Sequence, residues 1–247
     1  MDIIYDEPFR VTYYDLDCYG RLKLSAFLRM AHIAADINAR ELGAGFDDLA
    51  PRGMGFVLQR FGLTITRTPV YNETVGLRTW PASVAKGTFS RQGDMRDAAG
   101  QKLMEWTSLW VLLDLNARKI LRPSVLPIPL PDTDALGVNT EAVKVSFPEG
   151  WGELHSQYRH TVRYSEVDTN LHMNNTIYGD LIGNAVFDGE KKPAGAWTRA
   201  QINFLSEMRL GEEADVVCRR QDGVFWVTGT ARGTKTFSAL TAYGPSV

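Results

Sequence analysis

The residues best suited to chemistry lie in one short run, YSEVDTNLHMNNTIY, between Tyr164 and Tyr178. Asp168, Asn170 and His172 occupy alternate positions, so their side chains point the same way if the backbone there is extended. A carboxylate, an amide and an imidazole on one side of the chain could polarise a carbonyl group and position a water molecule. Residues of these types also form ordinary turns and helix caps, and that structural interpretation stays open for each of them taken singly.

A helix is predicted directly after this run, from about Asn174 to Phe187. Apolar residues recur there at helical spacing, at Ile177, Leu181, Ile182, Ala185 and Val186. The first turn of a helix offers unpaired backbone N–H groups and the positive end of the helix dipole. The sequence therefore predicts hydrogen-bond donors for a developing negative charge next to the polar run.

The first half of the chain predicts one helix and several antiparallel strands. Apolar residues at helical spacing place the helix at about Ser25 to Leu42, and Gly43 and Gly45 end it. The strand-like segments are 9–14, 56–68, 74–81, 88–96 and 102–115. A single helix with several antiparallel strands is an α+β pattern.

The second half repeats this order after a proline-containing segment, 123–154, which we interpret as an interdomain linker stiffened locally by proline. Strands are predicted at 160–164, 198–207, 213–219, 224–231 and 234–243. A shift of 151 positions places Tyr13, Asp17, Ser25 and Phe27 on Tyr164, Asp168, Thr176 and Tyr178, which indicates an internal duplication.

The two halves differ where the chemistry would be. Asn170, His172 and Asn174 are matched in the first half by Tyr19, Arg21 and Lys23. The second half is therefore predicted to hold the candidate site, and the first half to have kept the scaffold alone.

Composition limits the class of protein. The 247 residues carry a formal net charge of −2, whereas a nucleic-acid-binding protein is usually basic. No apolar run approaches the roughly 18 residues of a membrane span, and the acidic N-terminus lacks the features of a signal peptide, so we expect a cytoplasmic protein. Cys18 and Cys218 lie far apart without metal-ligand spacing, so reduced thiols are expected.

The chain resembles the acyl-ACP thioesterase family, the tandem hotdog enzymes of plants and bacteria. The most specific part is DTNLHMNNTIY, 168–178, which follows the family pattern D-x-N-x-H-x-N-N-x-x-Y. The stretches YYDLDCYGRLKLSAFLRMAH and EWTSLWVLLDLNARK are also family-like. The resemblance implies an α+β double hotdog: an N-terminal hotdog at 1–122, a linker at 123–154, and a catalytic C-terminal hotdog at 155–247.

The resemblance also implies hydrolysis of a fatty acyl thioester on acyl carrier protein (ACP), within fatty acid biosynthesis. Carried over by position, Asp168, Asn170 and His172 form the catalytic loop, and Glu207 is a further family acid. Plant members have a cysteine directly after this acid, where the present chain has Met208. A thioether cannot attack a thioester, so a covalent cysteine mechanism is excluded at that position.

Thioester hydrolysis needs a water, a base and donors for the oxyanion. We expect Glu207 and His172 to share the water and Glu207 to accept its proton. Glu207 is ionised unless it is buried, and burial would raise its pKa into a useful range. Asn170 and a backbone N–H at the helix start would face the oxyanion, with Asp168 orienting the loop. Which of Glu207 and His172 is the base stays open, because an acid beside Arg209 near a strand end is commonly a solvated ion pair.

The first half is expected to supply the acyl pocket. Met54, Phe56 and Leu58 are the candidate substrate-binding residues, since apolar side chains line pockets for acyl tails. His32, on the first helix, is expected to be a packing or surface residue. No His and acid residues have zinc-ligand spacing, so neither a metal nor another cofactor is expected.

Two rival functions stay open. An acyl-CoA thioesterase of the same fold would need basic residues for the phosphates of coenzyme A, and ACP would need a broad basic patch. Lys191-Lys192, Arg118-Lys119 and the Arg21/Lys23 pair could serve either partner. A non-catalytic acyl-binding module is the other rival, although its catalytic loop should be lost, and here the loop is intact. The sequence does not indicate whether two chains form a homodimer.

Overall fold

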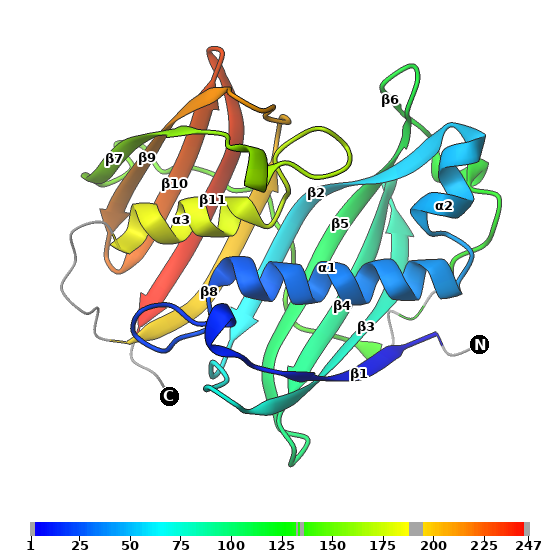
Figure 1. The fold of residues 1–247 in the computed structure, drawn as a ribbon, viewed down its shortest axis with the longest axis horizontal. Coiled ribbons are helices and arrows are strands. Elements are labelled where there is room, and N and C mark those ends of the chain that lie inside the picture. The colour runs from blue at the N-terminus through cyan, green and yellow to red at the C-terminus, as the bar shows by residue number, and fades with distance from the viewer. Residues whose placement is uncertain (1–2, 132, 134–135, 188–194, 245–247) are drawn as a thin grey trace.

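One antiparallel sheet runs through both halves of the molecule in a computed structural model that describes residues 3–131, 133, 136–187 and 195–244. The strand order is β1-β3-β4-β5-β2-β8-β11-β10-β9-β7, with the short β6 paired to β5. The two long helices lie across one face of this sheet (Figure 1). The predicted α+β architecture, one long helix against an antiparallel sheet in each half, is confirmed.

The first half contains the longer helix and the larger part of the sheet. Its elements are β1 (Tyr5–Arg10), α1 (Leu24–Glu41), α2 (Phe46–Leu49), β2 (Met54–Ile65), β3 (Thr74–Ala85), β4 (Thr88–Arg96), β5 (Lys102–Asp114) and β6 (Lys119–Ile120). The predicted strand at 9–14 is wrong at its C-terminal end. Tyr13–Asp15 is a 3-10 turn, because the Asp15 carboxylate accepts the Thr12 N–H at 2.9 Å and turns the chain.

The second half has the same order of elements. They are β7 (Glu153–Thr161), α3 (Ile177–Phe187), β8 (Ala196–Phe204), β9 (Glu213–Gln221), β10 (Val224–Ala231) and β11 (Thr234–Gly244). Three predicted elements have wrong boundaries: the strand placed at 160–164 is β7, the helix begins at Ile177, and the strand placed at 198–207 ends at Phe204, so Glu207 lies in the loop beyond it. Asn174 delays the helix start because its side-chain oxygen accepts the Thr176 N–H at 2.9 Å, a local turn that competes with helix.

The two halves join edge to edge. β2 pairs with β8 from Arg60 opposite Asn203 to Thr64 opposite Arg199, so the sheets lie side by side. The helices also meet, because a Cβ on Gly179 would lie 2.6 Å from the Ser25 nitrogen, and only glycine allows that approach. The Ser25 hydroxyl donates to Asp180 across the same contact.

The segment between the halves is held against the sheet. Gln201 and Asn203 alternate with the core residue Ile202, so they point to the face opposite the helices. Gln201 Nε2 donates to the Glu141 carbonyl at 2.7 Å, and Asn203 Oδ1 accepts the Val145 N–H at 2.7 Å. The predicted linker therefore covers the outer face of the β2–β8 junction.

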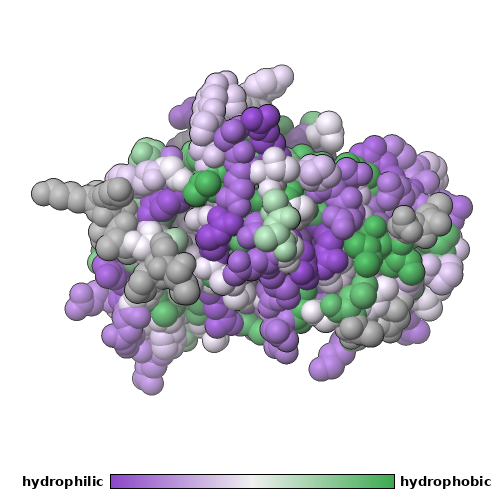
Figure 2. Space-filling view, turned by 90° about the horizontal axis from the view of Figure 1, so that it is seen from below, coloured by the Kyte–Doolittle hydropathy of each residue, from purple (hydrophilic) through white to green (hydrophobic). Residues whose placement is uncertain are grey.

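The interior of the sandwich between helices and sheet is apolar. Phe27 of α1 packs edge-on against Trp106, with ring centroids 5.3 Å apart. A smaller cluster beside α2 contains Leu49, Phe89 and Leu112. Seen from below, the surface is mostly hydrophilic, with a compact hydrophobic area on the side of the first half (Figure 2). None of the described helices is both long and apolar enough to cross a bilayer.

Candidate active site

Asp168 organises the polar loop. Its carboxylate accepts the Asn170 N–H at 2.9 Å and the Asn174 side-chain amide at 3.3 Å. Its own N–H donates to the His172 carbonyl at 3.1 Å, and Leu171 adopts a left-handed φ of 64° to close the turn. The loop is therefore a tight turn rather than the extended segment that alternation would need, and the Asp168 carboxylate lies at its centre.

The corresponding loop of the first half has the same geometry. Leu16 bridges to Leu22 there, as Val167 bridges to Met173 here, and both pairs differ by the shift of 151 seen in the sequence. Arg21 occupies the position of His172. It pairs with Asp17 at 2.7 Å and lies 4.7 Å from the centroid of the Phe187 ring. The duplication is thus visible in the backbone, and the Arg21 guanidinium is mostly buried between Asp17 and Phe187.

His172 lies between two carboxylates. Its Nε2 atom is 3.9 Å from Glu207 Oε2, and its Nδ1 atom is 4.0 Å from Asp168 Oδ1. The Met173 N–H donates to the Met208 carbonyl at 2.7 Å, which holds the loop against the segment between β8 and β9 that contains Glu207. A separation of 3.9 Å is too long for a direct hydrogen bond, and one bridging water can span it.

Glu207 is held by two arginines. Arg118 Nη2 lies 2.5 Å from Oε2, and Arg209 Nη2 lies 3.0 Å from Oε1. Partial burial raises the pKa of the Glu207 carboxyl, but the hydrogen bonds from Arg118 and Arg209 outweigh that effect and leave the pKa lowered. The expectation that burial would raise this pKa into a useful range is therefore wrong.

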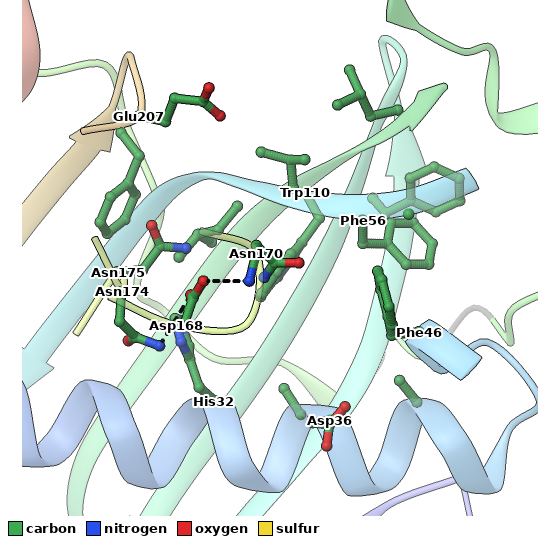
Figure 3. A pocket seen from close by; sticks show the side chains of 18 of the residues that line it. His32, Asp36, Phe46, Phe56, Trp110, Asp168, Asn170, Asn174, Asn175 and Glu207 are labelled. Carbon is green, nitrogen blue, oxygen red and sulfur yellow. Dashed lines mark hydrogen bonds between the residues drawn. The ribbon is translucent and has the colours of Figure 1, made fainter. Parts of the chain in front are cut away.

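A cavity of about 800 Å³ connects this acid to the first half of the molecule. Glu207 and the polar loop that contains Asp168 lie at one end, and Phe46 of α2 and Phe56 of β2 lie at the other (Figure 3). The α1 residues His32, Ala35 and Ala39 form one wall. The cavity has the dimensions of a small-molecule site and is built from both hotdog halves.

Two of the three predicted pocket residues line the cavity, and the third does not. Phe56 and Leu58 line the cavity, whereas Met54 packs against the cluster of Leu49, Phe89 and Leu112 beside it. Asp168, Asn170, His172 and Glu207 all line the cavity, so the structure brings these four residues together.

Comparison with known proteins decides the family. The family model of the acyl-ACP thioesterase N-terminal domain matches residues 2–124. The family model of the acyl-ACP thioesterase C-terminal domain matches residues 153–240. The chain belongs to the acyl-ACP thioesterase family. Solved structures similar to this family member include an acyl-ACP thioesterase from Bacteroides thetaiotaomicron (TM-score 0.82, 20% identity, 98% of each chain). The 12:0-ACP thioesterase from Umbellularia californica is also similar (TM-score 0.82, 17% identity, 99% of this chain and 98% of that one). The predicted double hotdog is confirmed.

Curated relatives of this acyl-ACP thioesterase family member are longer. A chloroplastic dodecanoyl-[acyl-carrier-protein] hydrolase of Cinnamomum camphora is 25% identical over 204 residues, which are 75% of this chain and 52% of the relative. A chloroplastic palmitoyl-acyl carrier protein thioesterase of Gossypium hirsutum is 20% identical over 71% of this chain and 45% of its own. The chain spans about half the length of the curated relatives it matches.

No cysteine lines the described cavity of this family member. Met208 is fully buried in the hydrophobic core. Cys218 is buried too, which raises the pKa of its thiol to about 12, and Cys18 is exposed elsewhere. No side-chain sulfur of a cysteine is therefore positioned in the cavity that the described residues form.

Arg118, His32 and Arg91 line the cavity, and the sequence did not place any of the three in the site. Arg118 was assigned only to a basic pair for a partner, yet it binds Glu207. His32 was expected to be a packing or surface residue, and it lines the cavity, as does Arg91. Lys191-Lys192, another of the basic pairs expected to serve a partner, lies outside the described residues.

Proposed function

We propose that this chain hydrolyses fatty acyl-ACP thioesters and releases a free fatty acid and holo-ACP, as a step of fatty acid biosynthesis. The observation that carries the proposal is the His172–Glu207 pair, 3.9 Å apart at one end of a cavity of about 800 Å³. The family and the names of the curated relatives, both hydrolases of acyl groups on ACP, support the same substrate class.

In the proposed mechanism a water bridges His172 Nε2 and Glu207 Oε2 and attacks the thioester carbonyl carbon. Glu207, whose lowered pKa keeps it ionised at neutral pH, accepts the proton of the water. The tetrahedral intermediate then breaks its carbon–sulfur bond, and the proton passes to the departing thiolate. Fatty acid and the thiol of holo-ACP are the products, with no covalent bond to the protein at any stage.

Asn170 is the donor best placed for the oxyanion. Its side chain lines the cavity and makes no hydrogen bond with any residue that the structure describes, whereas its backbone N–H is held by Asp168. The N–H groups of Thr176 and Ile177 already donate to Asn174. The helix start therefore offers fewer free backbone donors for an oxyanion than the sequence predicted. Such a donor is worth about 100- to 1000-fold in kcat.

The experiment that tests this function compares acyl-ACP with acyl-CoA of the same acyl chain, measuring released thiol and free acid. We expect higher kcat/KM for acyl-ACP, with one acid released per thiol. Faster hydrolysis of acyl-CoA would assign the chain to CoA thioesters instead. Tight binding of acyl-ACP without release of acid would make it an acyl-binding module and overturn the proposal.

A further inference from the structure

The wall of the cavity in the first half contains an arginine without an acid partner. Arg91 of β4 is only 9% exposed and lines the cavity. Its Nη1 atom donates to Asn38 Oδ1 of α1 at 2.8 Å and lies 3.4 Å from Thr79 Oγ1. Within the described part of the chain no carboxylate lies within 4.0 Å of its guanidinium. Burial lowers the pKa of Arg91 to about 10, which still leaves it charged at neutral pH.

Nearby acids do not compensate this charge. Asp36 also lines the cavity, but its carboxylate pairs with Arg40 on the exposed side of α1. By contrast, Asp94, a buried acid on the same strand, forms ion pairs with two arginines, Arg78 at 2.7 Å and Arg96 at 2.8 Å. Buried charges are normally paired, so the neutral partners of Arg91 leave its charge uncompensated.

A second polar group in the same wall also lacks a partner. His32 Nε2 is shielded from solvent and has no hydrogen bond within the described structure. Its ring lies 5.9 Å from Trp110, and burial lowers its pKa to about 4, so the imidazole is neutral. Figure 3 places His32 beneath the catalytic loop, whereas Asn38, the partner of Arg91, lies six residues farther along α1. Unmatched polar groups therefore occur at two places along the cavity, and a purely alkyl chain would satisfy neither.

We propose that Arg91 binds a carboxylate at the far end of the acyl chain, so that the preferred substrates are ω-carboxyacyl thioesters, the half-thioesters of dicarboxylic acids. A carboxylate supplies the missing counter-charge and matches the planar donors of a guanidinium. An alkyl terminus would instead strip water from an unpaired cation and gain no hydrogen bond. This inference rests on the proposed function, since it concerns the substrate of the same site.

The test uses matched pairs of acyl-ACP thioesters, straight-chain and ω-carboxyl, over a series of chain lengths. At the best length, wild-type protein should show kcat/KM about 10- to 100-fold higher for the ω-carboxyl member, as a charge-assisted hydrogen bond predicts. Arg91→Met should abolish or reverse that preference, and Arg91→Lys should keep part of it. Preference of the wild type for straight chains, unchanged in Arg91→Met, would overturn the inference and leave the proposed function intact. Turnover of neither class would contradict both.

A binding measurement covers the case in which Arg91→Met does not fold. Calorimetry on wild-type protein with free dicarboxylic acids and monocarboxylic acids of equal length needs no variant. Tighter binding of the diacid, weakened by added salt, supports the inference. Equal or tighter binding of the monoacid contradicts it.

Discussion

Arg118, in the turn between β5 and β6, donates to Glu207 in the loop after β8, with Nη2 and Oε2 2.5 Å apart. The first half of the chain thus supplies a cation to the acid of the second half. This contact lowers the pKa of the Glu207 carboxyl against the opposing effect of partial burial. The electrostatics of the site therefore depend on both halves, although the loop of Asp168 and His172 belongs to the second half alone.

The first prediction concerns pH. Replacing Arg118 and Arg209 by Gln removes the two main causes that lower the Glu207 pKa and leaves burial, which raises it. The carboxyl should then protonate at a higher pH, so the acid limb of the pH profile of kcat/KM should move to higher pH. Arg159→Gln is the control, because Arg159 forms comparable exposed ion pairs, with Asp215 at 3.0 Å, at the far edge of the sheet. An unshifted acid limb in the double variant would show that Glu207 does not set that limb.

The second prediction concerns the position where plant members have a cysteine. Met208→Leu conserves volume in a fully buried site, so stability should fall by less than about 1.5 kcal/mol and kcat should change little. Met208→Cys should give no acyl-enzyme on rapid mixing, since the position lies in the core. Thermal unfolding and quench-flow mass spectrometry are the measurements. A trapped acyl-cysteine in Met208→Cys would place this side chain within reach of the thioester.

The third prediction concerns chain length. Phe56→Ala enlarges the cavity and should favour longer chains, and Leu58→Phe should favour shorter ones. Each methylene gained or lost in the pocket is worth about 0.8 kcal/mol, or roughly fourfold in kcat/KM. Met54→Leu is the matched control, because Met54 packs beside the cavity without lining it. Variants that change the rate for all chain lengths equally would contradict the assignment of these residues to the acyl pocket.

The fourth prediction concerns cooperation between two side chains. Glu207→Gln and His172→Ala should each lower kcat severely, and the double variant should be little worse than either, because both act on one water. The measurement is a double-mutant cycle on kcat with acyl-ACP. Independent, multiplicative losses would mean that the two residues do not share the water.

Local sequence patterns predicted most of the fold. The bounds of β4 and β10 agree residue for residue with prediction, since each is a short segment between turn residues. Two of the errors lie where a side chain competes with the backbone for hydrogen bonds, as Asn174 does before α3 and Asp15 does after β1. The outcome of this competition depends on the detailed geometry of each turn, which hydrophobic periodicity in the sequence does not predict.

The site was predictable as far as it is local. Asp168, Asn170 and His172 lie within five positions, so their pattern could be found in the sequence. Arg118 is 89 residues from Glu207, and Arg91 reaches the cavity only through the sheet register, so tertiary packing alone reveals them. The pKa of Glu207 was mispredicted for the same reason, because burial was considered without the arginines.

In the proposed mechanism, Glu207 and His172 activate the water that hydrolyses acyl-ACP. The most direct test of this mechanism is rapid-mixing hydrolysis of acyl-ACP by wild-type protein and by Glu207→Gln, with released ACP and free acid measured together. We predict that the wild type releases both products in step without a burst, and that Glu207→Gln lowers kcat about 100- to 10,000-fold. A burst of ACP equal to the enzyme concentration, or near-normal turnover by Glu207→Gln, would contradict the mechanism.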